Sequence, residues 1–203
     1  MSKTITHLYD RYEDAKAAVS ELERVGVPHS DISIVANNAH GEHLAGSEAA
    51  EDAGKGAGTG AAIGGVGGLL AGLGVLAIPG LGPVVAAGWL ASTAVGAGVG
   101  AAIGGAAGGL VGALQKEGVS EHDAHVYSEG VRRGGTLVSA KVPDNLIAQA
   151  EAVLNRSGAV NPVERGNAYR EAGWSRFDET APAYDREQIE AERQRYAHDE
   201  RIV

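Results

Sequence analysis

Histidine pairs are the first residues in this chain whose type and spacing could support chemistry. His122 and His125 lie three residues apart on an expected helix and beside carboxylates, so that both imidazoles could face one metal ion. His40 and His43 form a second pair in a polar connector. Neither pair has an identifiable third ligand, and an ordinary exposed helix start explains the first pair as well. We therefore predict no metal site and no cofactor.

Patterns typical of nucleotide binding and catalysis do not appear in the sequence. The Gly54-Lys55 pair lacks the Ser or Thr that must follow the lysine of a P-loop, and the glycine-rich stretch contains no G-x-G-x-x-G. The carboxylates form no recognisable acid/base pair, and no G-x-S-x-G elbow occurs. We predict no catalytic residue and therefore no enzyme.

The composition of the chain limits the kinds of partner that it can bind. A formal net charge of -9 and a pI near 5.2 argue against nucleic acid, which favours a basic surface. The absence of cysteine excludes disulfides and cysteine-ligated metals. The first residues, Met1 to Asp14, are polar and lack the apolar region of a signal peptide, so membrane entry would depend on an internal segment.

Two ladders of glycine at a four-residue step dominate the uncharged stretch from Gly56 to Gln115. Residues four apart share one face of an α-helix, so each ladder predicts a groove where another helix can approach closely. This spacing is the small-xxx-small signature of helix packing. The ladder residues are Gly56, Gly60, Gly64, Gly68 and Gly72, followed by Gly96, Gly100, Gly104, Gly108 and Gly112.

A turn separates the ladders at Pro79, Gly80, Gly82 and Pro83, since these residues end one helix and allow a sharp reversal. The stretch 54–116 is thus predicted to be a glycine-zipper helical hairpin. Glycine inside an exposed helix costs about 1 kcal/mol relative to alanine, so ten of them disfavour isolated helices by about 10 kcal/mol. The hairpin must be packed, either in a lipid bilayer or inside a protein assembly.

The length of the hairpin arms and the lysines that flank them favour insertion into a bilayer, whereas the composition of the arms favours a protein assembly. The first arm, from Gly56 to Ala77, would span about 30 Å as a helix, which matches a hydrocarbon core. Lys55 and Lys116 bracket the hairpin and suit an orientation with both chain ends in the cytoplasm. Glycine and alanine dilute the hydrophobicity of both arms, however, and the exterior is acidic, as expected of a soluble oligomer.

The segment 1–53 reads as one β-α-β unit followed by an acidic connector. A β-rich run over 4–9 precedes a helix for which Asp10 and Glu13 predict a capping box and which Gly26 ends. The second strand covers 32–36. Together these elements form a β-α-β unit in fewer than 40 residues.

The sequence of 117–166 predicts the second half of an α+β domain. Ser120 and Asp123 predict the cap of a helix that reaches about Arg133, and a strand follows over 136–142. A helix opened by Pro143 and a short edge strand over 160–163 complete it. Two such halves predict an α+β, ferredoxin-like sandwich that the hairpin interrupts, with the helix before the third strand as an addition.

The last segment, 167–203, is hydrophilic. Asp185 and Gln188 predict the cap of a charged helix that reaches about His198, with Ile189 and Tyr196 as its only large apolar residues. Such a helix is expected to be a solvated tail or to await a partner.

These residues together resemble the bacterial general stress protein family with the 17M-like, or heat-induced stress protein, domain. The resemblance rests on Tyr9-Asp10 at the start of a helix, Val25-Gly26 before the strand 31–35, and 125–127 through 134–138, and covers most of 1–165. It implies a stress-response role without an established enzymatic activity. Glycine-zipper hairpins in other proteins associate with membranes, and this similarity adds to the membrane interpretation.

We therefore predict a non-enzymatic stress-response protein whose hairpin inserts into the cytoplasmic membrane, with both termini in the cytoplasm. Its partners would be membrane lipid and other copies of itself, bound through the ladders. The alternative is a cytoplasmic homo-oligomer with the hairpins bundled in its interior. A third hypothesis, a small-molecule or metal-binding domain, would be favoured by an ordered cluster around His122 and His125.

Overall fold

The computed structural model describes residues 2–38, 74–78, 80–91, 109–156 and 158–197. Its strands are β1 (Ser2–Tyr9), β2 (Ile32–Asn37), β3 (Gly74–Ile78), β4 (Gly82–Ala87), β5 (Thr136–Pro143) and β6 (Ala159–Val160). Its α-helices are α1 (Tyr12–Arg24), α4 (Gly109–Lys116), α5 (Glu121–Arg132), α6 (Ile147–Arg156), α7 (Pro162–Glu171) and α8 (Arg186–Ala197). Two short 3-10 helices, η1 (His29–Asp31) and η5 (Asp144–Leu146), precede β2 and α6.

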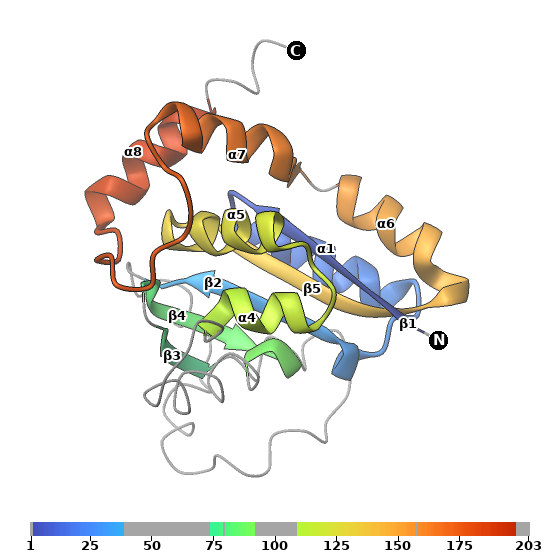
Figure 1. Ribbon diagram of the computed structural model, residues 1–203. Helices are drawn as coiled ribbons and strands as arrows, with labels where there is room; N and C mark the ends of the chain where they lie inside the picture. Colours follow the sequence, from blue (N-terminus) through green and yellow to red (C-terminus); the bar gives the residue numbers. More distant parts are fainter. Residues whose placement is uncertain (1, 39–73, 79, 92–108, 157, 198–203) are drawn as a thin grey trace.

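The strands form one antiparallel sheet in the order β3-β4-β2-β5-β1-β6. β1 and β5 pair along their whole length, from Ser2 opposite Pro143 to Tyr9 opposite Thr136. β2 lies on the other side of β5 and pairs in turn with β4. β5 therefore lies between β2 and β1, two strands from the N-terminal part of the chain (Figure 1).

The sheet is buried on both faces. Successive side chains of a strand point to opposite faces, so Ile34 and Val138 join one apolar cluster with α1 and α6, whereas Val35 and Leu137 join the other with α4 and α5. The prediction of an α+β fold is confirmed. The helix before the third strand, α5, does more than connect elements, because it covers the second face together with α4.

The predicted helical hairpin is wrong where its apex is described. Gly80, with a φ of +75°, lies in the turn between two strands, β3 and β4, and Gly82, with a φ of +76°, and Pro83 begin β4. Pro79 lies outside the described residues. β4 pairs with β2 and buries Val84 and Val85 completely, and this tertiary pairing overrides the helical pattern around the turn.

Two predictions at chain junctions are also wrong. Asp10 and Glu13 do not form a capping box, since the N-cap of α1 is Arg11 and no side chain caps it. The last strand ends at Val160, because the Asn161 side chain accepts hydrogen bonds from the next amides and starts α7 at Pro162.

The C-terminal segment is docked and is not a solvated tail. α8 begins with the predicted box, in which Gln188 Oε1 accepts from the Asp185 amide and Asp185 Oδ1 accepts from the Gln188 amide. Phe177 and Ile189 are buried, at 4% and 1% exposure. α7 and α8 thus close one end of the molecule (Figure 1).

Candidate functional sites

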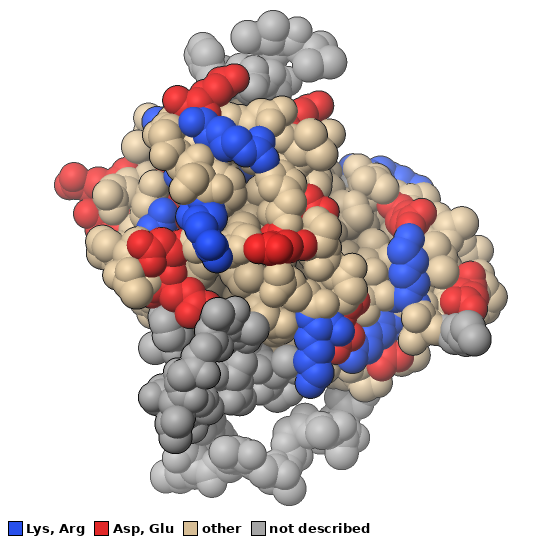
Figure 2. Space-filling model, in the orientation of Figure 1, with Lys and Arg blue, Asp and Glu red and all other residues tan. Residues whose placement is uncertain are grey.

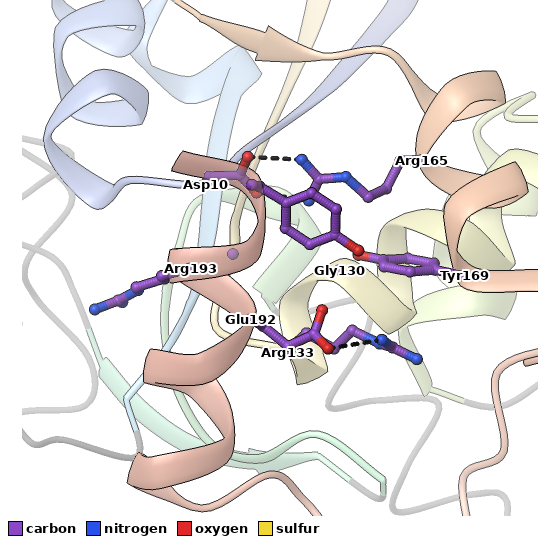
Figure 3. A pocket seen from close by; sticks show the side chains of 9 residues that line it. Asp10, Gly130, Arg133, Arg165, Tyr169, Glu192 and Arg193 are labelled. Carbon is purple, nitrogen blue, oxygen red and sulfur yellow. Dashed lines mark hydrogen bonds and ion pairs between the residues drawn. The ribbon is translucent and has the colours of Figure 1, made fainter. Parts of the chain in front are cut away.

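Charged and aromatic side chains gather where the end of α5 meets α7 and α8 (Figure 3). We call this set the arginine cluster, and it draws on four parts of the chain. It consists of Asp10 after β1, Glu129 and Arg133 at the end of α5, Arg165 and Tyr169 on α7, and Glu192 and Tyr196 on α8.

Arg133 holds α5 and α8 together. Its Nε donates to Glu129 Oε1 over 2.6 Å, and its Nη1 donates to Glu192 Oε1 over 3.2 Å. The guanidinium carbon lies 4.2 Å from the centre of the Tyr169 ring. Burial alone would lower the pKa of Arg133, but the hydrogen bond and charge of Glu129 and the charge of Glu192 outweigh it and raise the pKa. Arg133 is therefore a permanently charged, buried link.

Arg165 makes the matching link between α7, β1 and α8. Both of its terminal nitrogens donate to the Asp10 carboxylate over 2.7 Å, a bidentate pair, and its guanidinium carbon lies 3.6 Å from the centre of the Tyr196 ring. Burial would lower the pKa of Arg165, but Asp10 raises it. The carboxylate that the sequence assigned to a helix cap therefore anchors the C-terminal segment.

The glycine that follows α5 leaves room for α8 to pack against the backbone. Gly134 has a φ of +99°, and a Cβ there would overlap the side chain of Ile189. Arg193 Nη2 lies 3.5 Å from the Gly134 carbonyl oxygen. Ile189, Glu192 and Tyr196 lie on one helical face, and this i, i+3, i+7 spacing is the sequence signal that could have predicted docking.

The arginine cluster is closed to substrates. The cavity at its centre measures about 10 Å³, roughly the room that one water molecule needs. Arg133 and Arg165 are already paired with carboxylates of the same chain. The arrangement fixes helices in place and leaves no room for a reacting molecule.

A second, more open hollow of about 410 Å³ lies between the start of α5 and the turn after α7. It brings the predicted pair His122 and His125 together with residues that the sequence did not point to. Its lining comprises Glu121, His122, His125, Trp174, Ser175 and Arg176. Arg170 reaches its edge, with Nη2 2.9 Å from His122 Nε2.

His125 has an unusual environment in this hollow. Burial lowers its pKa, the positive charge of Arg176 and the neighbouring His122 lower it further, and Glu121 opposes them. Its Nε2 lies 4.0 Å from Glu121 Oε1. Within the described ranges, no three His, Cys, Asp or Glu residues are grouped so that they could hold a metal ion.

Most of the ladder lies outside the described residues. This holds for Gly56, Gly60, Gly64, Gly68, Gly72, Gly96, Gly100, Gly104 and Gly108. Gly112 lies in α4, a helix that packs on α5 and whose Leu110 and Leu114 are fully buried. In the part of the chain that the structure describes, every helix is too short or too polar to cross a bilayer.

Comparison with known proteins finds a family that matches part of the chain. Residues 4–78 match the family model of the heat induced stress protein YflT domain. The match confirms the resemblance to heat-induced stress proteins over this range, and it supports a stress-response role. No curated protein and no solved structure matches the chain.

Proposed function

From the heat induced stress domain in residues 4–78, we propose that this chain is a non-enzymatic stress-response protein that self-associates through its glycine ladders. The domain match carries the stress role. The ladders carry the association, because glycine at a four-residue step favours close packing of helices and is costly anywhere else.

We infer that the core of the domain is a ferredoxin-like unit. The units β1-α1-β2 and β5-α6-β6 together supply four strands in the order β6-β1-β5-β2, with antiparallel neighbours throughout. α4 and α5 on the second face, the β3–β4 pair at one edge, and α7 and α8 are additions to it.

The arginine cluster has a structural role and is not a candidate active site. A catalytic arginine must be free to bind substrate, whereas the guanidinium groups of Arg133 and Arg165 are ion-paired with carboxylates of the same chain. These carboxylates are Glu129, Glu192 and Asp10. The charge distribution also supports the exclusion of nucleic acid as a partner. On the face drawn in Figure 2, basic and acidic side chains are interspersed and form no continuous basic surface.

The pairing of β4 with β2 favours a cytoplasmic assembly over the membrane hairpin. An inserted hairpin with both ends in the cytoplasm would carry its apex, at 80–83, across the bilayer. Gly82–Ala87 forms β4, however, and β4 is hydrogen bonded to β2 in the same sheet as the N-terminal strand. One segment cannot lie on both sides of a membrane, so we place the ladders in contacts between copies of the chain.

Sizing of ladder variants tests this proposal. Gly64→Leu and Gly104→Leu fill the predicted packing groove, whereas Ala62→Leu and Ala102→Leu add the same side chain on the opposite side of the expected helices. Light scattering should show an oligomer in the wild type and in the alanine variants, and smaller species in the glycine variants. Unchanged size in the glycine variants would exclude the ladders as the contact.

Cell fractionation separates the two environments. We expect untagged protein to stay out of the membrane fraction, or to leave it in a carbonate wash, and then to elute as one large species. Protein that stays with washed membranes and leaves only in detergent would favour insertion and would contradict the assembly.

A further inference from the structure

The hollow beside His122 and His125 has no part in the proposed self-association, yet it gathers unsatisfied polar groups. It is shaped by the first turn of α5 and by residues 174–176 after α7. Gly166 makes the approach of these helices possible, since a Cβ there would lie 3.0 Å from Val126 and 3.3 Å from His122 Nε2. The hollow is therefore a consequence of how α7 docks on α5.

Arginines at this hollow differ from those of the arginine cluster. Arg176 is exposed and makes no ion pair with any described residue. Arg170 is held at the rim by Asn167 Oδ1, 2.6 Å from its Nη1, and by the His122 ring. Among the described residues, no carboxylate contacts either guanidinium, whereas Arg133 and Arg165 are both paired with carboxylates.

Hydrogen-bonding groups in the same wall also lack partners. Trp174 Nε1 and His125 Nδ1 are buried and have no hydrogen-bond partner among the described residues. The Ser175 side chain adds an exposed hydroxyl. Unpartnered polar atoms beside a hollow of this size are the features expected of a ligand site, because buried polar groups are otherwise satisfied within the protein.

The charges around the hollow favour a negative ligand. Two carboxylates belong to the same turn, but Asp123 is engaged as part of the helix cap, since Ser120 Oγ donates to its Oδ2 over 2.8 Å. The Glu121 side chain is 74% exposed and opposes the positive groups only weakly, because water screens it and its Oε1 lies 4.0 Å from His125 Nε2. The positive end of the α5 dipole adds to the arginines and imidazoles.

We infer that this hollow binds a small oxyanion, the phosphate or carboxylate group of a small molecule, between Arg176, Arg170 and the imidazoles of His122 and His125. Arg176 is the principal cation, because it has no other charged partner within the described residues. Ser175 contributes a hydroxyl donor, and the Trp174 ring forms an apolar wall for the rest of the ligand.

Binding is coupled to proton uptake. His125 faces Arg176 across the hollow and Glu121 and His122 on its own helix, and without a ligand its pKa is below 6.5 because of burial and Arg176. A bound oxyanion raises that pKa, so the imidazole takes up a proton on binding. For an anion whose own charge does not change, the contribution of His125 to the affinity therefore increases as the pH falls below 6.5.

Titration of the isotopically labelled full chain with inorganic phosphate, and separately with acetate, tests the site at constant ionic strength. The probes are the imidazole resonances of His122 and His125 and the indole resonance of Trp174. We expect at least one anion to give saturable shifts in the millimolar range. The pH dependence is read with acetate, which keeps its charge in this range, and its binding should be tighter at lower pH. Saturation by phosphate alone assigns a phosphoryl ligand, and saturation by acetate alone assigns a carboxylate.

Arg176→Gln and Arg156→Gln form a matched pair of variants. Both residues are exposed arginines, but Arg156 lies on α6, on the other face of the sheet, with a side chain that is 71% exposed. Arg176→Gln should weaken binding by about tenfold, whereas Arg156→Gln should bind as the wild type does. Shifts that rise linearly with both anions, or equal affinity in the two variants, would mean an adventitious ion only and would overturn the site.

Discussion

At the scale of single residues, Glu192 is the most informative side chain in the molecule. It is 7% exposed, comes from a helix that the sequence assigns to solvent, and binds Arg133 on α5. Buried ion pairs contribute little net stability compared with apolar packing, but removing one partner leaves the other charge poorly compensated. The pair therefore specifies where α8 docks.

Glu192→Gln should destabilise the protein by about 1–3 kcal/mol, because Arg133 loses one of its two carboxylates and keeps Glu129. Glu190→Gln, the same change on an exposed position of the same helix, should change the free energy of unfolding by less than about 0.5 kcal/mol. Urea unfolding of both variants measures the difference. Equal effects would show that Arg133 does not depend on Glu192.

His7 gives the protein a predictable acid response. Burial lowers its pKa from 6.5, while the hydrogen bond to Asn155 and the charge of Glu151 partly oppose this. The unfolded chain then takes up a proton first, so His7 favours the folded state above pH 6.5 and this contribution is lost as the pH falls through the lowered pKa. His125 acts in the same direction.

The stability curve of His7→Gln should be flatter below pH 6.5 than that of the wild type. His29→Gln, at a histidine whose side chain is 43% exposed, is the matched control. Chemical denaturation at a series of pH values measures both curves. A wild-type slope that survives in His7→Gln would assign the acid response to other groups.

At the scale of elements, the docking of α8 depends on backbone as much as on charge. Gly134 and Gly158 share a positive φ, of +99° and +74°, yet only Gly134 lies against another side chain, that of Ile189. A Cβ at Gly158 would meet nothing within 4 Å. Substitutions at these two glycines therefore distinguish the effect of backbone strain from that of a steric clash with Ile189.

Gly134→Ala should release α8, and Gly158→Ala should not. Both variants carry a backbone strain of about 1–2 kcal/mol. Only in Gly134→Ala does the new methyl group also overlap the Ile189 side chain and displace it. Hydrogen exchange of the amides in 186–197 should therefore accelerate in Gly134→Ala alone. Equal protection in both variants would show that the contact between Gly134 and Ile189 does not hold α8 in place.

Elements with a local signal could be predicted from the sequence, and elements that depend on distant partners could not. Ser120 and Asp123 cap α5 as expected, with the Asp123 amide 3.1 Å from Ser120 Oγ, because capping needs only neighbouring residues. β4 was expected to be helical, since its identity as a strand comes from β2, more than 40 residues earlier. The arginine cluster escaped prediction for the same reason, because Asp10 and Arg165 are 155 positions apart.

The candidate site was partly visible in the sequence. The spacing of His122 and His125 identified the first turn of α5 correctly, but a metal was the chemistry that the pair suggested. The cations at the hollow, Arg170 and Arg176, come from a segment expected to be solvated, and only the docking of α7 on α5 brings them there. Fold topology, which the local pattern does not contain, decides what the pair can bind.

At the scale of the whole molecule, one sheet separates two cores. Leu22 on α1 belongs to the first core and Leu114 on α4 to the second, and both are fully buried. Every described strand is hydrogen bonded to a neighbour in the same sheet, so we expect the two faces to unfold in one cooperative transition.

Leu22→Ala and Leu114→Ala should each cost about 2–5 kcal/mol, since each removes a buried side chain. Because the two sites share no packing neighbours across the sheet, the double variant should lose about the sum. Denaturation followed by fluorescence and by circular dichroism should give one coincident transition in every variant. Two separate transitions would show that the faces unfold independently.

The pairing of β1 also governs how the chain can fold as it is made. β1 is made before both of its neighbours, β5 and β6, and its Ser2 pairs with Pro143, which is more than 130 positions later. At a usual synthesis rate of about 5–20 residues per second, β1 waits on the order of 10 s for its partner. During that time Ile5, Leu8 and the apolar face of α1 have no sheet to cover them. The nascent chain therefore exposes this apolar surface at least until Thr136–Pro143 has been translated.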